Sequence, residues 1–371
     1  MSARTFGGRC ARFESLELRQ LLAGDVTVSV VEGNLVVEGD ELANQIAITA
    51  GEVPGTYIVR GLDGTNVVHS PTPTAETSPV DEVVVTGVTG DARIGLGAGD
   101  DRLVVSNVGF RGGVLVRMGE GNDEVAIGLR PVPEANPETV STAEPEMSDF
   151  VRIRGALKIG TGEGDDKVHV DHAVIGGQLR VEAGRGEDVV RLGHADPPTP
   201  GDLTSATAVV RNVLRVDQGI HVELDAGRDQ FFADAVLTGH GLLANGGEGE
   251  DALHTHHVRS GGPLVLLGGG GDSADTIDVA RVRAGTALLA TGDGNDHVRI
   301  VDSAFRVLGV ALGNGDDSLR LRGNKAGWAF LLGGDGTDEL HNVGGNRFGH
   351  HFDYGFESHA DPSDEPDSIV A

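Results

Sequence analysis

Apolar side chains recur at alternate positions along most of this chain, in short stretches separated by glycine-rich turns. One set of stretches carries the pairs Leu103 and Val105, Val125 and Ile127, Val168 and Val170, Val298 and Ile300, and Leu319 and Leu321. A second set carries Leu157 and Ile159, Leu179 and Val181, Leu264 and Leu266, and Leu308 and Val310. A period of two places these side chains on one face of a β-strand. The pattern therefore predicts two strands, joined by a bend, in each repeating unit.

A glycine-aspartate turn follows the second strand of each unit. Residues 246–253 and 333–340 match G-G-x-G-x-D-x-U, where U is a large apolar residue, a pattern typical of calcium-binding parallel β-helices. Eight looser copies complete a set of ten turn aspartates: Asp101, Asp123, Asp166, Asp188, Asp229, Asp251, Asp275, Asp296, Asp317 and Asp338. Neighbouring aspartates are 21 to 24 residues apart, except for one interval of 43 and one of 41. This period predicts an all-β, right-handed parallel β-solenoid with rungs of 21–22 residues.

The repeat divides the chain into four parts. Residues 1–24 lack it, and residues 25–90 predict divergent capping strands in which Asn44 takes the place of a turn aspartate. Residues 91–343 form the regular solenoid, and its two long intervals contain proline-rich loop insertions at about 130–150 and 195–213. Both insertions begin six residues after an aspartate, so we expect them on one edge, two rungs apart. Residues 344–371 predict a C-terminal cap and an acidic tail.

The first 24 residues point to export. They contain four arginines, Arg4, Arg9, Arg12 and Arg19, and residues 13–22 carry the one convincing helix pattern of the chain. Residues 14–22, E-S-L-E-L-R-Q-L-L, resemble the E-S-L-E-P-R-x-L-L segment of large planctomycete extracytoplasmic proteins, with Leu18 in place of the proline. Residues 25–28 and 33–40 resemble the first strands of that family, and the Gly-Asp turns resemble RTX (hemolysin-type) repeats. The resemblance implies an extracytoplasmic protein, secreted or at the cell surface, and implies no activity. The alternative is an amphipathic helix that caps the first rung.

Composition narrows the possible partners. The net charge of −28 argues against nucleic acid and anionic membranes and favours solubility and cation binding. The chain has one cysteine, Cys10, so it forms no intrachain disulfide. It contains no run of 18 apolar residues, so we expect no membrane span. The 58 glycines fall in register with the apolar pattern, which associates them with the repeat rather than with disorder.

The ten turn aspartates are the candidate metal ligands, with Ca²⁺ as the expected cofactor. Calcium takes six to eight oxygen ligands, and stacked turns bring carboxylates to about 4.8 Å from those of the next rung. The alternative is that each aspartate accepts hydrogen bonds from N–H groups of its own turn. RTX proteins repeat their nonapeptide every nine residues, so that Gly-Asp turns line both edges of the solenoid. Here each rung carries a Gly-Asp turn on one edge only. That difference strengthens the capping alternative.

A second candidate binding site is the column of outward positions three residues after each aspartate. It is occupied by Val104, Ala126, His169, Arg191, Phe232, His254, Asp278, Arg299, Arg320 and His341, of which six are Arg or His. Polysaccharide lyases place basic side chains of a β-helix over acidic sugars, so this column supports a polysaccharide-binding or lyase-like alternative. Solvated strand positions that balance the acidic turns are the simpler interpretation. We therefore expect no enzyme and no catalytic residues.

Histidine clusters are a third candidate. His254 and His256 share one strand face with His257 beside them, and His350 and His351 are adjacent. A zinc site needs three or four converging ligands, and the sequence supplies no carboxylate at a spacing that completes one. H-E-x-x-H, G-x-S-x-G and P-loop patterns are absent, and the glycine runs precede strands, which excludes a dinucleotide-binding fold.

The outward positions of the strand before each turn change along the chain. Early rungs present polar residues such as Arg93, Arg117 and Lys158, and later rungs present apolar ones such as Val265 and Leu288. Strands apolar on both faces are normally buried on both, so we expect a partner, most simply a second copy. Together these features predict an exported structural or adhesive solenoid that could also meet an extracellular glycan or surface protein.

Overall fold

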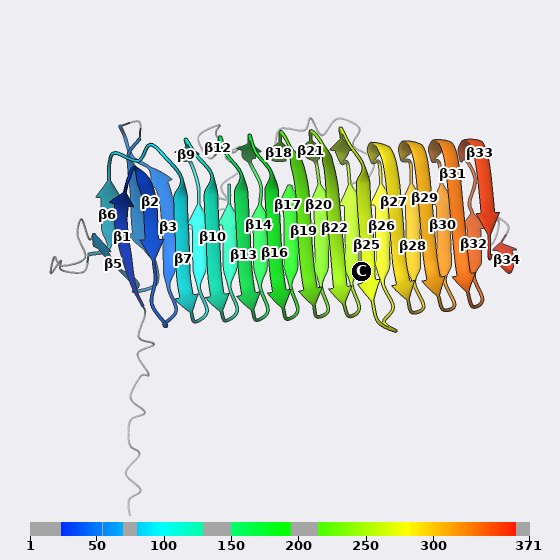
Figure 1. Ribbon diagram of the computed structural model, residues 1–371, viewed down its shortest axis with the longest axis horizontal. Helices are drawn as coiled ribbons and strands as arrows, with labels where there is room; N and C mark the ends of the chain where they lie inside the picture. The colour runs from blue at the N-terminus through cyan, green and yellow to red at the C-terminus, as the bar shows by residue number, and fades with distance from the viewer. Residues whose placement is uncertain (1–23, 54, 70–79, 129–149, 194–213, 361–371) are drawn as a thin grey trace, which may run out of the picture.

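The structure is a computed structural model that describes residues 24–53, 55–69, 80–128, 150–193 and 214–360. Within these ranges the protein is a parallel β-solenoid built from two sheets that face each other across one narrow core, and it contains no helix. The rungs stack into a straight rod with the two sheets along its length (Figure 1). The predicted fold class is therefore confirmed. The helix pattern of residues 13–22 lies outside the described residues.

Sheet A has 20 strands and sheet B has 14. The strands of sheet A are β1 (Asp25–Val31), β2 (Asn34–Glu38), β5 (Asn66–His69), β7 (Ala92–Ala98), β9 (Gly109–Phe110), β10 (Val114–Glu120), β12 (Val151–Ile153), β13 (Leu157–Glu163), β15 (Ala173–Ile175), β16 (Leu179–Arg185), β18 (Leu214–Val216), β19 (Gly219–Ala226), β21 (Val236–Thr238), β22 (Gly241–Glu248), β24 (Arg259–Ser260), β25 (Leu264–Gly270), β27 (Arg283–Asp293), β29 (Ala304–Asn314), β31 (Lys325–Asp335) and β33 (Arg347–Tyr354). Those of sheet B are β3 (Gln45–Ala50), β4 (Tyr57–Gly61), β6 (Glu82–Val85), β8 (Arg102–Val105), β11 (Glu124–Ile127), β14 (Lys167–Val170), β17 (Val189–Gly193), β20 (Gln230–Asp234), β23 (Ala252–His256), β26 (Thr276–Ala280), β28 (His297–Val301), β30 (Ser318–Arg322), β32 (Glu339–Asn342) and β34 (Ser358–Ala360).

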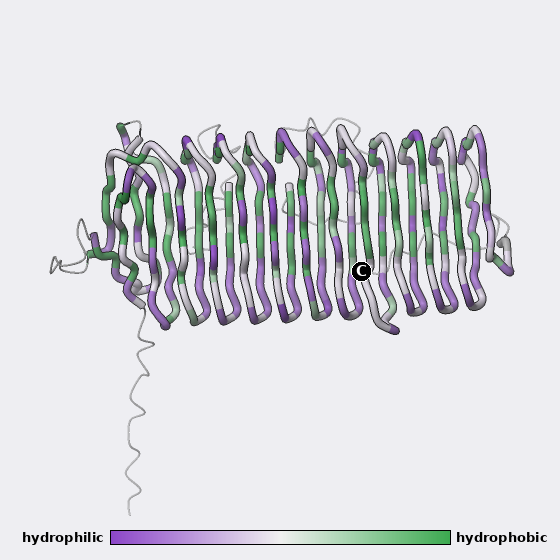
Figure 2. The backbone as a smooth tube through the Cα atoms, viewed as in Figure 1, coloured by the Kyte–Doolittle hydropathy of each residue, from purple (hydrophilic) through white to green (hydrophobic). Residues whose placement is uncertain are grey.

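Each rung follows the alternation of the sequence. A sheet B strand leaves the Gly-Asp turn, a bend leads to sheet A, and one long or two short sheet A strands return to the next turn. Inward positions form continuous aliphatic columns such as Leu157, Leu179 and Ile220, all buried. Green and purple segments alternate along many of the strands in Figure 2. The core is therefore one thin layer that no single rung could bury alone.

The two long intervals are single rungs with an insertion. β11 pairs directly with β14, and β17 pairs directly with β20, in unbroken parallel register. The flanks of the first insertion join β11 to β12, and those of the second join β17 to β18. These are equivalent sheet B to sheet A bends, two rungs apart and at the end of the rung opposite the Gly-Asp turns. The insertions themselves, residues 129–149 and 194–213, lie outside the described residues.

The N-terminal cap departs from the parallel repeat. β1 and β2 pair antiparallel, as do β3 with β4 and β4 with β6, although β3 also pairs in parallel with β8. Residues 61–68 imitate an outgoing rung strand in sequence, but β5 lies in sheet A and pairs with β1. The cap therefore closes the rod with hairpins, which leave fewer unpaired strand groups at its end.

The repeat continues beyond residue 343. β33 pairs in parallel with β31, and β34 pairs with β32, so residues 347–360 form a further rung. Residues 347–354 extend the rod as strand β33. Two of its inward positions are polar, because His351 lies opposite Ala329 and Asp353 lies opposite Leu331, whereas Phe348 lies opposite Ala326 and packs against the core. The last rung thus ends the apolar core with an ion pair of 3.9 Å between His351 and Asp353.

Candidate functional site

The ten turn aspartates form one buried column, which we call the aspartate ladder. Each side chain is between 0% and 4% exposed. Oδ1 of each aspartate accepts a hydrogen bond from the backbone N–H of the equivalent residue one rung earlier, over 2.7–3.1 Å from Asp101 to Asp338. Asn44 begins the column and Glu357 ends it by accepting from Asp338 N–H at 2.7 Å. The ladder therefore ties successive rungs together through their turns.

The second oxygen of the ladder carboxylates lies on the core side. Oδ2 of every ladder residue except Asp275 is buried without a hydrogen-bond partner among the described residues. In two later rungs, Oδ2 of Asp251 and Asp338 occupies the space beside Gly246 and Gly333, where an added Cβ would come within 2.3–2.4 Å. Nine of the ten carboxylates thus have one oxygen held by the chain and one buried oxygen without a hydrogen-bond partner among the described residues.

This setting changes the acidity of the ladder. Burial raises the pKa of Asp101, Asp123, Asp188, Asp229 and Asp275 to about 7 and that of Asp317 to about 6, with neighbouring carboxylates adding to the rise and the N–H hydrogen bond opposing it. Burial also raises the pKa of Asp166, Asp251, Asp296 and Asp338. A proton on Oδ2 fits this environment. The Oδ1 contacts differ from the predicted capping of each aspartate's own turn, because the donor N–H belongs to the turn one rung earlier. Calcium binding at these residues stays a prediction.

Two further ladders were not anticipated from the sequence. On the outer side of the Gly-Asp turns, Asp100 accepts from Asn122 N–H, Asn122 from Asp165 N–H, and Asp165 from Glu187 N–H, all over 2.8–2.9 Å. At the opposite bend, Ser303 N–H donates to Asn324 Oδ1 at 3.0 Å, and Asn324 N–H donates to Asn346 Oδ1 at 2.8 Å. The signal was a short polar residue recurring every 21 or 22 residues.

The predicted column of basic residues is a single outward row on sheet B. Register places His169, Arg191, Phe232, His254, Asp278, Arg299 and Arg320 side by side in successive rungs. The row is not uniformly basic. Arg191 lies 5.4 Å from the centre of the Phe232 ring, and Arg299 forms an ion pair with Asp278 at 3.1 Å. Much of its charge is therefore engaged within the row.

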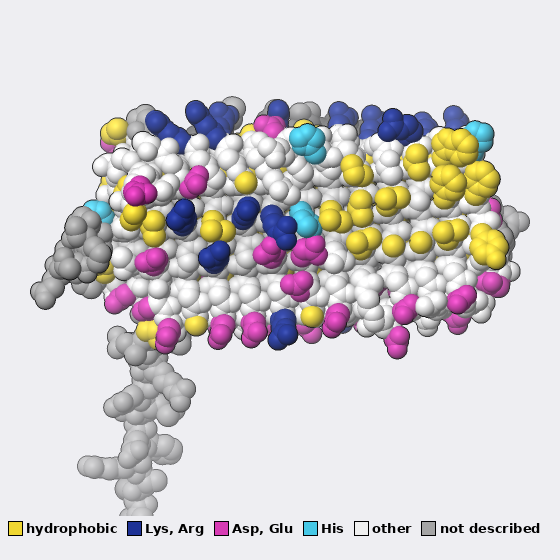
Figure 3. All heavy atoms as spheres, in the orientation of Figure 1, with side chains coloured by type: hydrophobic (Ala, Val, Ile, Leu, Met, Phe, Trp, Pro, Cys, Tyr) yellow, Lys and Arg dark blue, Asp and Glu magenta, His cyan; other side chains and the backbone are white. Residues whose placement is uncertain are grey.

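A groove of 820 Å³ crosses the outer face of sheet A in the N-terminal half. Arg93, Arg117, Lys158 and Arg180 line it. Arg180 pairs with Glu182, whereas none of the other three makes an ion pair with a carboxylate of another described residue. Gly160 also lines the groove, and a Cβ added there would meet only Glu182 O, at 4.0 Å. Basic side chains cluster over this part of the face in Figure 3.

The C-terminal half of the same face is apolar. Leu288, Trp328, Phe330, Leu332 and Phe352 are 41–54% exposed, and Tyr354 is 80% exposed. Trp328 stacks on His350 with ring centres 3.9 Å apart, and Phe330 lies parallel to Phe352 at 5.5 Å. Figure 3 shows hydrophobic side chains gathered over the C-terminal half of this face, most densely near its end. We refer to it as the apolar stripe.

The long edges of the rod carry opposite charges. Exposed arginines and a lysine line the edge opposite the Gly-Asp turns: Arg152, Arg154, Arg215, Arg259, Arg283, Arg306, Lys325 and Arg347. Exposed carboxylates line the Gly-Asp edge, among them Asp100, Glu120, Asp165, Glu187, Glu248, Asp293, Asp316 and Asp335. Figure 3 shows the two edges as a dark blue row and a magenta row.

No protein-family model matches the chain, and no curated protein matches it. In the described part of the chain, no helix has the length and apolar character needed to cross a membrane.

Proposed function

We propose that the protein is an extracytoplasmic adhesive solenoid that binds acidic polysaccharide along the basic groove of sheet A. The observation that carries this proposal is the groove itself. It concentrates unpaired cations on a chain whose net charge is −28. The export expected from residues 1–24 would place this surface where extracellular glycans occur.

The groove suits a polymer better than a small molecule. Its cations come from successive rungs, so they follow one another at about the rung spacing of 4.8 Å along the rod axis. Arginine forms bidentate hydrogen bonds with carboxylates and sulfates, and lysine acts as a point charge. An extended chain with a negative group on each sugar could therefore lie along the rod and meet one cation after another.

A polysaccharide lyase is the alternative that uses the same surface. In that reaction a base removes the proton beside the uronate carboxyl group, and the glycosidic oxygen leaves as a double bond forms in the sugar. The same cations would neutralise the carboxylate. The two functions differ in their product, because only the lyase generates unsaturated sugar, which absorbs ultraviolet light.

The test is binding of the purified protein to polygalacturonate, with a neutral glucan as the polymer control. We expect Lys158→Ala to weaken the Kd at low salt by on the order of tenfold, since a charged hydrogen bond contributes about 1.5–3 kcal/mol. Lys167→Ala is the matched control, because Lys167 is an exposed lysine at the start of the next rung but on sheet B. Equal binding by the two variants would contradict the proposal, and growth of ultraviolet absorbance would favour the lyase.

A second function, self-association, is favoured by the apolar stripe. Soluble monomers rarely leave large contiguous apolar areas exposed. The polar inward residues of the last rung, His351 and Asp353, disfavour end-to-end stacking of rods, because inward-pointing charges protect strand edges. We propose that a second copy packs laterally against the stripe.

A further inference from the structure

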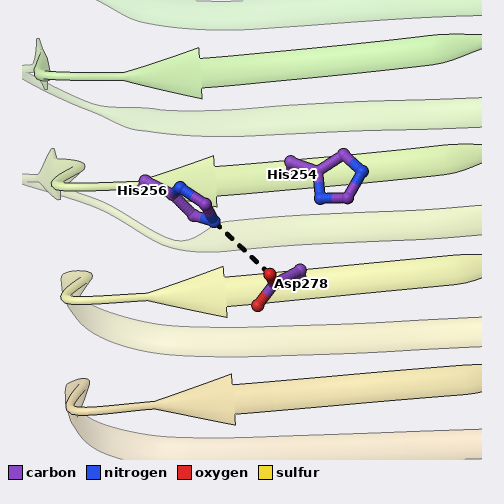
Figure 4. Close-up of side chains that lie close together, drawn as sticks. All are labelled: His254, His256 and Asp278. Atoms are coloured by element: carbon purple, nitrogen blue, oxygen red, sulfur yellow. Dashed lines mark ion pairs between the residues drawn. The ribbon is translucent and has the colours of Figure 1, made fainter. Parts of the chain in front are cut away.

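His254, His256 and Asp278 converge on the outer face of sheet B (Figure 4). His254 and His256 are alternate residues of β23 and therefore point to the same side. Asp278 lies directly opposite His254 on the neighbouring strand β26. One nitrogen of each histidine and one carboxylate oxygen lie within 4.8 Å of one another. We propose that these three side chains form a binding site for a divalent transition metal such as Zn²⁺.

The donor atoms match the chemistry of such an ion. Two imidazoles and one carboxylate suit zinc and its neighbours, which bind at about 2.0–2.2 Å from each donor. His256 Nε2 and Asp278 Oδ2 are already 3.5 Å apart, close to the separation of two ligands on one tetrahedral ion. His256 Nε2 is also buried without a hydrogen-bond partner among the described residues. A bound ion would satisfy this nitrogen.

Neighbouring side chains hold the ligands in place. His254 stacks on Phe232 with ring centres 4.9 Å apart and planes 8° apart. Arg299 donates to both oxygens of Asp278 at 3.1 and 3.3 Å. A carboxylate has lone pairs for both an arginine and a metal, and such outer partners commonly orient metal ligands. These contacts therefore reduce the conformational entropy that the ligand side chains would lose when a metal binds.

The side chains of His256 and Asp278 are 20% and 16% exposed. The fourth position of the ion thus faces solvent, as in zinc sites that bind water or a ligand.

The test uses the full chain without an affinity tag, stripped with chelator and titrated calorimetrically with Zn²⁺ in excess Ca²⁺. We expect one Zn²⁺ equivalent per chain to be lost, or its Kd raised at least about tenfold, in His254→Ala, His256→Ala and Asp278→Ala. His341→Ala is the matched control. His341 occupies the same outward row three rungs beyond Asp278 and contacts Glu339 at 3.0 Å. Circular dichroism verifies the fold of each variant.

Cobalt gives a readout that does not depend on variants. Co²⁺ bound by imidazole in a four- or five-coordinate site absorbs visible light strongly, whereas the hydrated ion absorbs weakly. We expect strong absorbance in the wild type that one equivalent of Zn²⁺ abolishes. Weak absorbance throughout, or zinc binding unchanged in all three ligand variants, would overturn the site and leave the cluster as an ion-paired surface patch.

Discussion

A ladder aspartate faces two demands at once. Its Oδ1 must accept a backbone N–H, which any carboxylate or amide can do, while Oδ2 lies buried without a partner. An ionised oxygen in that position costs desolvation energy, whereas a protonated one carries no charge. The raised pKa values of the ladder express this balance.

The first prediction is that stability falls as pH rises. The folded-state pKa of several ladder residues is about 7, against about 3.9 in the unfolded chain. The folded state therefore binds more protons between these values, and the stabilisation present below pH 4 is lost as pH passes through 7. We expect a higher Tm at pH 5 than at pH 8 in chelator, measured by circular dichroism. A Tm that rises from pH 5 to pH 8 would contradict the protonated ladder.

The second prediction concerns calcium and uses the same thermal melts. If Ca²⁺ binds at the ladder, millimolar Ca²⁺ should raise the Tm through preferential binding to the folded state. The increase should be larger at pH 8, where the carboxylates are ionised and no longer carry protons. Identical melts in Ca²⁺ and chelator at both pH values would leave the aspartates as caps only.

A third prediction separates hydrogen bonding from charge. Asp188 N–H donates to Asp229 Oδ1 at 2.7 Å, so Asp229→Ala should cost about 1–3 kcal/mol by leaving a buried N–H unpaired. Asp229→Asn keeps the acceptor and removes the charge. Asn44 already occupies this column, and its Nδ2 donates to Leu42 O at 2.6 Å. We expect the Asn variant to melt at or above the wild type at pH 8 and the Ala variant below it. A shared loss in both would mean that the charge itself is required.

Among the elements, the Gly-Asp turns depend on glycine for space between rungs. Gly119 has a φ of +125°, and a Cβ there would lie 1.6 Å from Gly97 O. Such a conformation costs other residues about 1–3 kcal/mol before the collision is counted. The turn must therefore open if the residue carries a side chain.

The fourth prediction follows from that contact. Gly119→Ala should lower the Tm strongly or abolish soluble expression, while Gly95→Ala, in the neighbouring rung, should stay within about 0.5 kcal/mol of the wild type. A Cβ at Gly95 has no atom within 4 Å. Thermal melts of both variants provide the measurement, and equal Tm values would show that the turn tolerates displacement.

The sequence predicted the elements that repeat and missed those that do not. Period-two alternation and the spacing of the turns predicted the two strands of each rung, and Asn44 was expected in the aspartate column. The final rung escaped notice because Glu357 replaces aspartate after only 19 residues. The hairpins of β3, β4 and β6 use antiparallel pairing, which the repeat does not encode.

Sites that join neighbouring rungs were harder to predict. Asp278 was identified as an outward residue, but its place beside His254 depends on the register between two turns 24 residues apart. The inward direction of ladder Oδ2 likewise depends on turn geometry. The two-residue alternation in the sequence shows which face of a strand a residue occupies. The register of the stacked strands is needed to show which residues of other rungs it contacts.

At the scale of the whole molecule, the apolar stripe leads to the fifth prediction. Val265→Asp with Leu288→Asp should convert a self-associating protein into a monomer, since both residues lie in one outward row. Leu115→Asp is the control, because Leu115 belongs to the equivalent row of an N-terminal rung. The molar mass is measured by light scattering at tens of micromolar protein. A monomeric wild type would contradict self-association and mean that something else covers the stripe.

Separation of charge between the two long edges makes the rod an electric dipole across its width. In the field of an anionic polymer or surface, such a body experiences a torque that turns its arginine edge forward and its carboxylate edge away. Orientation would then precede contact. Screening by salt limits this effect to about 10 Å in 0.1 M salt. The rod therefore approaches with a preferred side at low ionic strength and with random orientation at high ionic strength.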